Sequence, residues 1–338
     1  MSRWSSGLAV AAVAAVSVIQ SSAQGQNQAR PSPPGSGASS YKVPRTPWGD
    51  PDLQGNYTNL SEAGTPLERP KQFEGKNMND VPAAERRRLK KEQAEQTIGR
   101  FTGWAEAPDN WWQPAYGKFV EEGAQLWFIV DPPSGRMPAL TPAAIKRQQD
   151  RAAARKQSGR GPADSYEDRS LYDRCITRGY PGSMMPSIYG NAYHIAQAPG
   201  HVAITYEMIH DTRIIPLDRR PRLGGAFQLD MGDARGRWEG DTLVVETTNF
   251  RDRSVYQNAN PDTLKVTERF TRLSPRTVRW MVTVEDPTTW TAPWTFSMPL
   301  TQDETEPLVP YECHEGNYGL KNILSAARAD ERAAQAGK

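Results

Sequence analysis

Three of the four histidines of the chain stand beside other side chains that can transfer protons. His210 lies in the run EMIHD (207–211), and His314 lies in ECHEG (312–316). An imidazole has an ordinary pKa of about 6.5, so it can give or take a proton near neutral pH when a carboxylate orients it. We therefore expect His/carboxylate acid–base chemistry. The candidate proton-transfer residues are His210, His314, Glu315, Glu207 and Asp211.

Basic and aromatic residues near these motifs predict a ligand-binding surface. An arginine that faces an empty pocket can hold a carboxylate or phosphate through two parallel hydrogen bonds, and aromatic rings pack against apolar ligands. The candidate ligand-binding residues are Arg213, Arg178, Tyr193, Tyr206, His194 and Trp290. Further aromatics that could line a pocket are Trp111, Trp112, Tyr189 and Trp294. Two alternatives stay open, because the rings can fill the core instead and the histidines can cap turns.

The sequence predicts no bound cofactor. It contains no GxSxG, GxxxxGK[ST] or GxGxxG motif, so the signals of a nucleophile elbow, a phosphate loop and a dinucleotide site are missing. His194, His210 and His314 could hold zinc together with a carboxylate, but no HExxH or similar spacing accompanies them. We expect no metal at the site, and a zinc centre is the alternative.

The first 23 residues predict a secretory signal peptide. Arg3 supplies a positive start, and Gly7 to Ile19 forms a short apolar stretch before a run of small residues. Export places Cys175 and Cys313, the only two cysteines, in an oxidising compartment, where we expect a disulfide between them. A reactive thiol or a thiolate metal ligand is the alternative. The expected location is periplasmic or secreted.

Charge and hydropathy narrow the range of partners. The formal net charge of +2 lacks the basic excess of a nucleic-acid-binding protein. After the first twenty residues no apolar run approaches the ~20 residues that cross a bilayer, so no membrane span is expected in the mature chain. Ten Trp, twelve Tyr and eight Phe are enough to build a core. The expected partner is a small-molecule ligand or substrate.

Hydrophobic periodicity predicts a series of hairpins and a few polar helices. From Asp173 onward apolar residues alternate with polar ones, and turn residues separate the runs. The expected strand pairs are 194–198 with 202–209, 235–238 with 242–248, and 264–273 with 278–286. Further strands are expected over 52–59, 125–130 and 294–300, and polar helices over 81–98, 141–157 and 322–334. We expect a mainly β protein, an antiparallel meander forming a barrel or sandwich with peripheral polar helices.

Composition divides the chain into segments. A stretch rich in Gln, Ser, Pro and Gly follows the signal peptide and can bury few side chains. The expected segments are the signal peptide (1–23), a flexible linker (24–47), an irregular N-terminal part with two helices (48–165), a β-rich core (166–321) and a C-terminal helix (322–338).

Several longer strings carry a resemblance to known proteins. They include PDLQGNYTN, EMIHDTRIIPLD, GRWEGDTLVVETTNF and CHEGNY, and with related strings they span 51–324. On these residues the chain resembles a broad family of uncharacterised exported bacterial proteins. Its run of hairpins is also similar to lipocalin-like barrels. The resemblance implies export and membership of that family, and it implies no particular reaction.

These observations lead to one expected function and two alternatives. The expected function is an exported small-molecule enzyme that uses His/carboxylate acid–base chemistry, of hydrolase, lyase or isomerase type. The first alternative is a non-catalytic periplasmic binding protein for a hydrophobic or aromatic ligand, and the second is a structural protein of the cell envelope. Convergence of His194, His210 and His314, with Glu and Arg, at the base of a pocket favours catalysis, whereas a deep apolar pocket with no ionisable group at its base favours binding.

Overall fold

The computed structural model describes residues 41–99, 125–187, 189–304, 308–309 and 311–337. The predicted signal peptide, Trp111 and Trp112 lie outside these residues. The described residues build an antiparallel sheet of ten strands, which confirms the predicted mainly β barrel. The strands are β1 (Gly55–Thr58), β2 (Ile129–Asp131), β3 (Ala192–Ala198), β4 (His201–Tyr206), β5 (Thr212–Pro216), β6 (Asp233–Glu239), β7 (Thr242–Thr248), β8 (Lys265–Arg272), β9 (Thr277–Glu285) and β10 (Trp294–Gln302).

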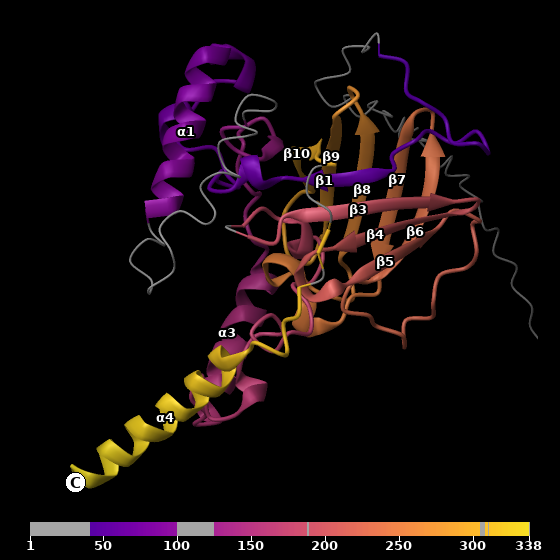
Figure 1. Cartoon of the computed structure of the whole chain (residues 1–338). Coiled ribbons are helices and arrows are strands. Elements are labelled where there is room, and N and C mark those ends of the chain that lie inside the picture. Colours follow the sequence, from indigo (N-terminus) through magenta and orange to yellow (C-terminus); the bar gives the residue numbers. More distant parts are fainter. Residues whose placement is uncertain (1–40, 100–124, 188, 305–307, 310, 338) are drawn as a thin grey trace, which may run out of the picture. The chain divides into compact units, whose positions relative to one another are not determined.

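The sheet nearly closes on itself. Its strand order is β5-β4-β3-β1-β10-β9-β8-β7-β6, and β2 pairs with β10 outside this path. Figure 1 shows β1, β3, β4 and β5 crossing the other strands as a second layer. At the seam between β5 and β6, a Cβ built on Gly236 would lie 2.8 Å from Ile215 Cγ2. Because any larger residue would push these edges apart, the glycine lets the barrel approach closure.

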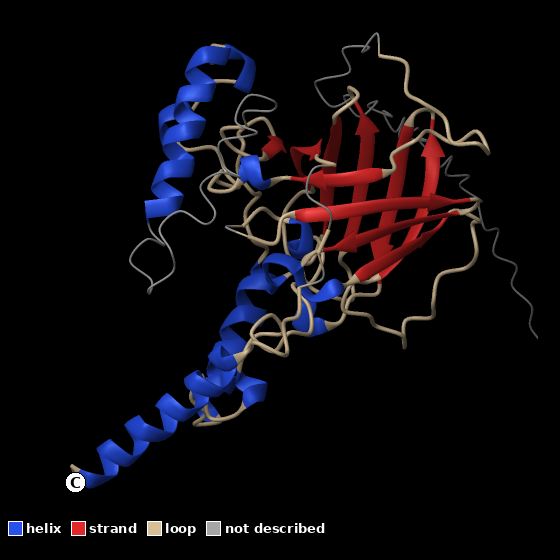
Figure 2. Ribbon diagram, in the orientation of Figure 1, coloured by secondary structure: helices blue, strands red, loops and turns tan. Residues whose placement is uncertain are grey.

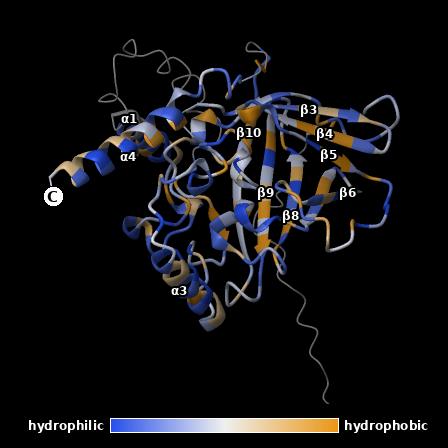
Figure 3. Ribbon diagram, turned by 90° about the horizontal axis from the view of Figure 1, so that it is seen from below, coloured by the Kyte–Doolittle hydropathy of each residue, from blue (hydrophilic) through white to orange (hydrophobic). Residues whose placement is uncertain are grey.

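Alternation along the strands decides which side chains fill the barrel. In β8, Val266, Glu268 and Phe270 are buried, and the residues between them are partly exposed. Strand β9 alternates in the same way, and its Trp280 lies opposite Phe270 with the ring centroids 6.4 Å apart. Figure 3 shows orange, hydrophobic residues along β8 and β9 interrupted by more polar ones. This period of two is what a sheet with one buried face requires.

Within the described residues, long helices accompany the barrel without forming part of its wall (Figure 2). They are α1 (Ala83–Gly99), α3 (Pro142–Gln157) and α4 (Tyr318–Ala336). The Thr141 hydroxyl accepts a hydrogen bond from Ala144 N at 3.1 Å and begins α3 as predicted. Arg147 of the same helix donates to the Thr289 hydroxyl at 2.6 Å. No helix within the described ranges is long and apolar enough to cross a membrane.

Helix α1 differs from the predicted solvated helix at Lys90. The Lys90 side chain is 1% exposed, and its Nζ lies 3.2 Å from Glu62 Oε2. Its neighbour Leu89 packs against a small apolar cluster that includes Phe73 and Trp127. Burial raises the pKa of Glu62 against the attraction of Lys90, and it lowers the pKa of Lys90. The partner of Lys90 lies far away in sequence, so helical periodicity alone cannot identify this contact.

The barrel encloses a second buried ion pair. Arg213 Nη2 lies 2.6 Å from Glu268 Oε2, and these residues are 4% and 0% exposed. Trp280 Nε1 donates to the other carboxylate oxygen at 3.0 Å, and the Tyr180 hydroxyl donates to the same oxygen. Arg213 Cζ also lies 4.0 Å from the centroid of the Tyr180 ring. One cluster therefore joins β5, β8, β9 and the segment that leads into β3.

The electrostatics of this cluster keep Arg213 charged. Burial is the largest single effect and disfavours the charge of Arg213, but Glu268, Tyr180 and Tyr206 together outweigh it and raise the pKa of the guanidinium. Burial also raises the pKa of Tyr180 well above its ordinary value, so its hydroxyl keeps the proton that it donates. Hydrogen bonds from Trp280 and Tyr180 to Glu268, and from Arg213 Nη2 to Thr247, offset part of the desolvation cost, while Nε and Nη1 of Arg213 have no hydrogen-bond partner among the described residues.

Removing one partner of the Arg213–Glu268 pair should destabilise the protein strongly. Arg213→Met and Glu268→Leu are each expected to lower the free energy of unfolding by about 3–5 kcal/mol, because each leaves an uncompensated buried charge. The double variant should lose clearly less than the sum, because neither charge remains. Urea unfolding of the four proteins measures the coupling. A double variant that loses the full sum would contradict this role of the pair.

Candidate functional site

His210 does not lie directly after a regular strand, as the predicted strand over 202–209 implied. The extended strand was expected to continue to residue 209, but β4 ends at Tyr206 and a short 3₁₀ turn covers Met208–His210. Ile209 and His210 have φ angles of 66° and 56°, so the alternation of faces that would place His210 at the end of the apolar face is lost. His210 is exposed, and a further strand that was not predicted, β5, begins at Thr212.

The other two histidines of the predicted cluster have separate surroundings. His194 Nδ1 lies 2.8 Å from Asn56 Oδ1, on the strand β1 that pairs with β3. His314 and Glu315 are exposed in the loop before α4. Within the described residues no hydrogen bond or ion pair joins any two of these histidines, and no group of three His, Cys, Asp or Glu side chains could hold a metal ion. The three imidazoles therefore lie in separate surroundings and do not form one cluster.

The two carboxylates near His210 differ from each other. Glu207 Oε2 accepts a hydrogen bond from Ala192 N at 3.0 Å, which ties the end of β4 to the start of β3. Asp211 is partly buried, and burial raises its pKa although the Thr212 N–H and the Thr177 hydroxyl donate to it. The nearby charge of Asp230 raises that pKa further. The surroundings of Asp211 therefore favour its protonated form more than water does.

Four predicted ligand-binding residues lie in the core. Arg213 and Tyr206 are buried beside Glu268, and the Tyr193 hydroxyl donates to Asn59 Oδ1 at 3.1 Å. Trp290 is 3% exposed and packs edge-on against Trp294. These side chains lie on inward faces of the sheet or against its end, where aromatic rings fill volume. The alternative of core packing is the one that the structure favours for them.

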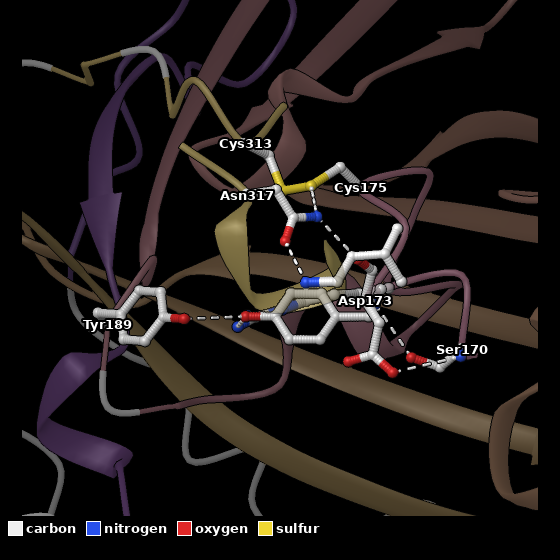
Figure 4. The surroundings of a disulfide bond; sticks show 9 residues. Ser170, Asp173, Cys175, Tyr189, Cys313 and Asn317 are labelled. Atoms are coloured by element: carbon white, nitrogen blue, oxygen red, sulfur yellow. Dashed lines mark hydrogen bonds between the residues drawn. A yellow bond between two sulfur atoms is a disulfide. The ribbon is translucent and has the colours of Figure 1, made fainter. Parts of the chain in front are cut away.

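Cys175 and Cys313 form the predicted disulfide, with their Cα atoms 5.7 Å apart (Figure 4). Asn317 Nδ2 lies 3.2 Å from Cys175 Sγ and donates to Asp173 O at 2.9 Å. The side-chain oxygen of Asn317 accepts from Leu320 N at 3.1 Å and so begins α4. The bond therefore ties the loop around Asp173 to the start of the C-terminal helix.

A cavity of about 420 Å³ lies beside this disulfide-linked loop. Its walls come from the segments on either side of Cys175 and from the segment that follows β7. Leu171, Tyr172, Met185 and Val255 supply apolar surface. The polar and small residues of the lining are Ser170, Thr177, Arg178, Gly179, Gly182, Ser187, Arg253 and Ser254. A volume of this size is typical of a small-molecule site.

Two contacts hold the walls of the cavity together. Tyr180 and Val255 form a parallel bridge, so the chain segments that carry them run side by side. Gly179 has a φ of +70°, and a Cβ built on it would lie 2.4 Å from Ser254 O. Only glycine permits this approach. Since the Tyr180 ring is itself buried against Arg213, the barrel core fixes the position of the cavity wall.

Arg178 is the predicted ligand-binding residue that reaches this cavity. Its guanidinium lies 4.7 Å from the Tyr172 ring centroid, and Nη2 donates to the Tyr172 hydroxyl at 3.2 Å. The Tyr172 hydroxyl lies 3.2 Å from that of Tyr189, which is labelled in Figure 4. Burial, together with the hydrogen bond to Tyr172, raises the pKa of Tyr189, so this hydroxyl stays protonated. The tyrosines hold Arg178 in place and add no negative charge.

Sequence reasoning missed most of the cavity lining. Arg253 lies in a polar segment after β7 that carries no motif, and Val255 and Met185 are single apolar residues in loops. The one available signal was the predicted disulfide, which implied that the residues around Cys175 are held in place. No spacing rule connects these residues with those near Arg253.

Comparisons with protein-family models, curated proteins and solved structures found no match to this chain. The predicted membership of a family of exported bacterial proteins therefore stays a prediction. The proposals for this site therefore rest on the geometry of its residues.

Loss of the disulfide should weaken the fold substantially. The bond joins residues separated by 138 positions, and closing so long a loop restricts the unfolded chain by about 4–5 kcal/mol in the chain-entropy model. We expect the Cys175→Ser/Cys313→Ser variant to lose free energy of unfolding on that scale. Denaturant unfolding of the oxidised protein and the double variant tests this. A loss below about 1 kcal/mol would contradict it.

Proposed function

We propose that this chain is an exported, non-catalytic binding protein for a small ligand with an apolar or aromatic body, held in the cavity beside the disulfide. The cavity of about 420 Å³ is the observation that carries the proposal. Its lining combines apolar surface, from Leu171, Tyr172 and Val255, with about as much polar surface. Ligand sites commonly combine an apolar lining with a small number of polar groups that orient the ligand.

The location outside the cytoplasm is part of the same proposal. The Cys175–Cys313 disulfide supports it, because such bonds persist in oxidising compartments and are rare in the cytosol. The predicted signal peptide supports it independently, from the opposite end of the chain. A binding protein of this kind acts by capturing its ligand outside the cell membrane, and it needs no acid–base group within the cavity.

A substitution at Gly182 can be used to fill the cavity. It lines the cavity, yet a Cβ built on it would meet nothing within 4 Å. A side chain added there would therefore enter space that is free for a ligand. Gly225 offers a matched control, because a Cβ built on it also meets nothing within 4 Å and it does not line the cavity.

Filling the cavity should abolish binding. We expect the native protein to bind 2-naphthol or 2-naphthoate, two-ring compounds of suitable size, and Gly182→Leu to weaken binding by more than about tenfold because the leucine occupies the same volume. Gly225→Leu should bind like the native protein. Isothermal calorimetry and ligand-observed NMR measure both. If neither compound binds to the native protein, or if Gly182→Leu binds as well as the native protein, the proposed function is overturned.

Acid–base catalysis is a second candidate function, now centred on Asp211 and not on the histidines. Asp211 is favoured by one observation: its carboxyl has a raised pKa and accepts a hydrogen bond from Thr177, which lines the cavity. A carboxyl whose pKa is raised by burial is suited to general acid or base work. Hydrolysis of 4-nitrophenyl 2-naphthoate that is lost in Asp211→Asn, with binding of 2-naphthoate retained, would support this candidate.

The raised pKa of Asp211 should also appear in the stability of the protein. The native state holds this proton more tightly than the unfolded state, so the contribution of Asp211 to stability falls as the pH rises from about 4 through the pKa of the folded state. Asp211→Asn removes this titration, and its stability should fall less over the same range. Thermal unfolding between about pH 4 and 7 measures the difference. Parallel pH profiles for the two proteins would contradict the raised pKa.

A further inference from the structure

Two arginines face the same cavity. Tyr180 and Val255 form a bridge between two segments. Arg178 lies two residues before Tyr180, and Arg253 lies two residues before Val255. Both line the cavity. The bridge therefore brings two guanidinium groups from distant parts of the sequence to one site.

Neither arginine has a carboxylate partner within the described residues. Some neighbouring arginines do: Arg169 pairs with Asp173, and Arg251 pairs with Asp230, whereas Arg174 stacks on Tyr166. Arg178 instead contacts the Tyr172 ring and hydroxyl, which carry no charge. Arg253 is exposed and has no ion pair. Two positive groups that share a cavity repel each other, and an anion placed between them relieves that repulsion.

We propose that the ligand of this cavity is an aromatic carboxylate, with its carboxylate held by Arg178 and Arg253 and its ring packed against Tyr172 and the apolar wall. This inference rests on the proposed function and specifies the class of ligand. A guanidinium presents parallel N–H donors that match a carboxylate, and such charge-assisted bonds are stronger than neutral ones. The ring packs against the apolar residues of the lining, Leu171, Met185 and Val255. The charge and the apolar body of the ligand thus have separate recognition elements.

The experiment compares two ligands of nearly equal shape. 2-Naphthoate carries the carboxylate, and 2-naphthamide replaces it with an uncharged amide. Calorimetry with the full chain should show that 2-naphthoate binds at least about tenfold more tightly than 2-naphthamide and weakens as salt rises. Inorganic phosphate alone should bind more weakly than 2-naphthoate, because it leaves the apolar wall unfilled.

Variants then test which residues bind the carboxylate of 2-naphthoate. Arg253→Ala and Arg178→Lys should each weaken 2-naphthoate by about tenfold and leave 2-naphthamide unchanged, because lysine lacks the planar fork. Arg174→Ala is the control, since Arg174 stacks on Tyr166 and does not line the cavity. Circular dichroism checks that each variant is folded, and Arg253 is exposed enough to be replaced without loss of packing.

The outcomes separate this inference from the proposed function. Equal affinity for 2-naphthamide and 2-naphthoate, or unchanged affinity in Arg253→Ala and Arg178→Lys, would overturn the anionic class while the cavity stays a ligand site. Phosphate binding as tight as that of 2-naphthoate would overturn the aromatic part. If neither naphthalene compound nor 2-naphthol binds to the native protein, both the inference and the proposed function fail.

Discussion

The buried contact between Arg213 and Glu268 constrains the rest of this structure. A charge pair inside a barrel is tolerated only when every partner is in place, because each ion loses its hydration. Here the partners come from β5, β8, β9 and Tyr180, so the cluster requires both layers of the sheet to be assembled. The pair thus links the closure of the barrel to the position of a loop outside it.

That loop carries one wall of the cavity. Tyr180 anchors it from the barrel side, and the Cys175–Cys313 bond anchors it from the side of α4. The segment between these two anchors includes Arg178, whose guanidinium rests on Tyr172. A side chain held in this way loses little further freedom when it meets a ligand, which is the advantage of a preformed site. The apolar core and the disulfide therefore both hold a wall of the cavity in place.

The sequence predicted the parts of the fold that depend on local patterns. The alternation in β8 and β9 and the pairing of two cysteines could be found because each follows a simple rule. Strand β5 was missed because the backbone turns through two left-handed residues, Ile209 and His210, just before it. Arg213 was expected at a binding site because it stands close to the His210 motif, yet it is buried against Glu268 of the regular strand β8. The cavity joins loops that no periodic pattern relates.

The strand order has a consequence for the edges of the sheet. Strand β10 pairs with β1 on one side and β9 on the other, so within the described residues its backbone ladder joins the early strands to the later meander. Without β10 the strands fall into two groups, β5-β4-β3-β1 and β9-β8-β7-β6, whose inner edges would be unpaired. Because unpaired strand edges promote aggregation, β10 protects both groups at once.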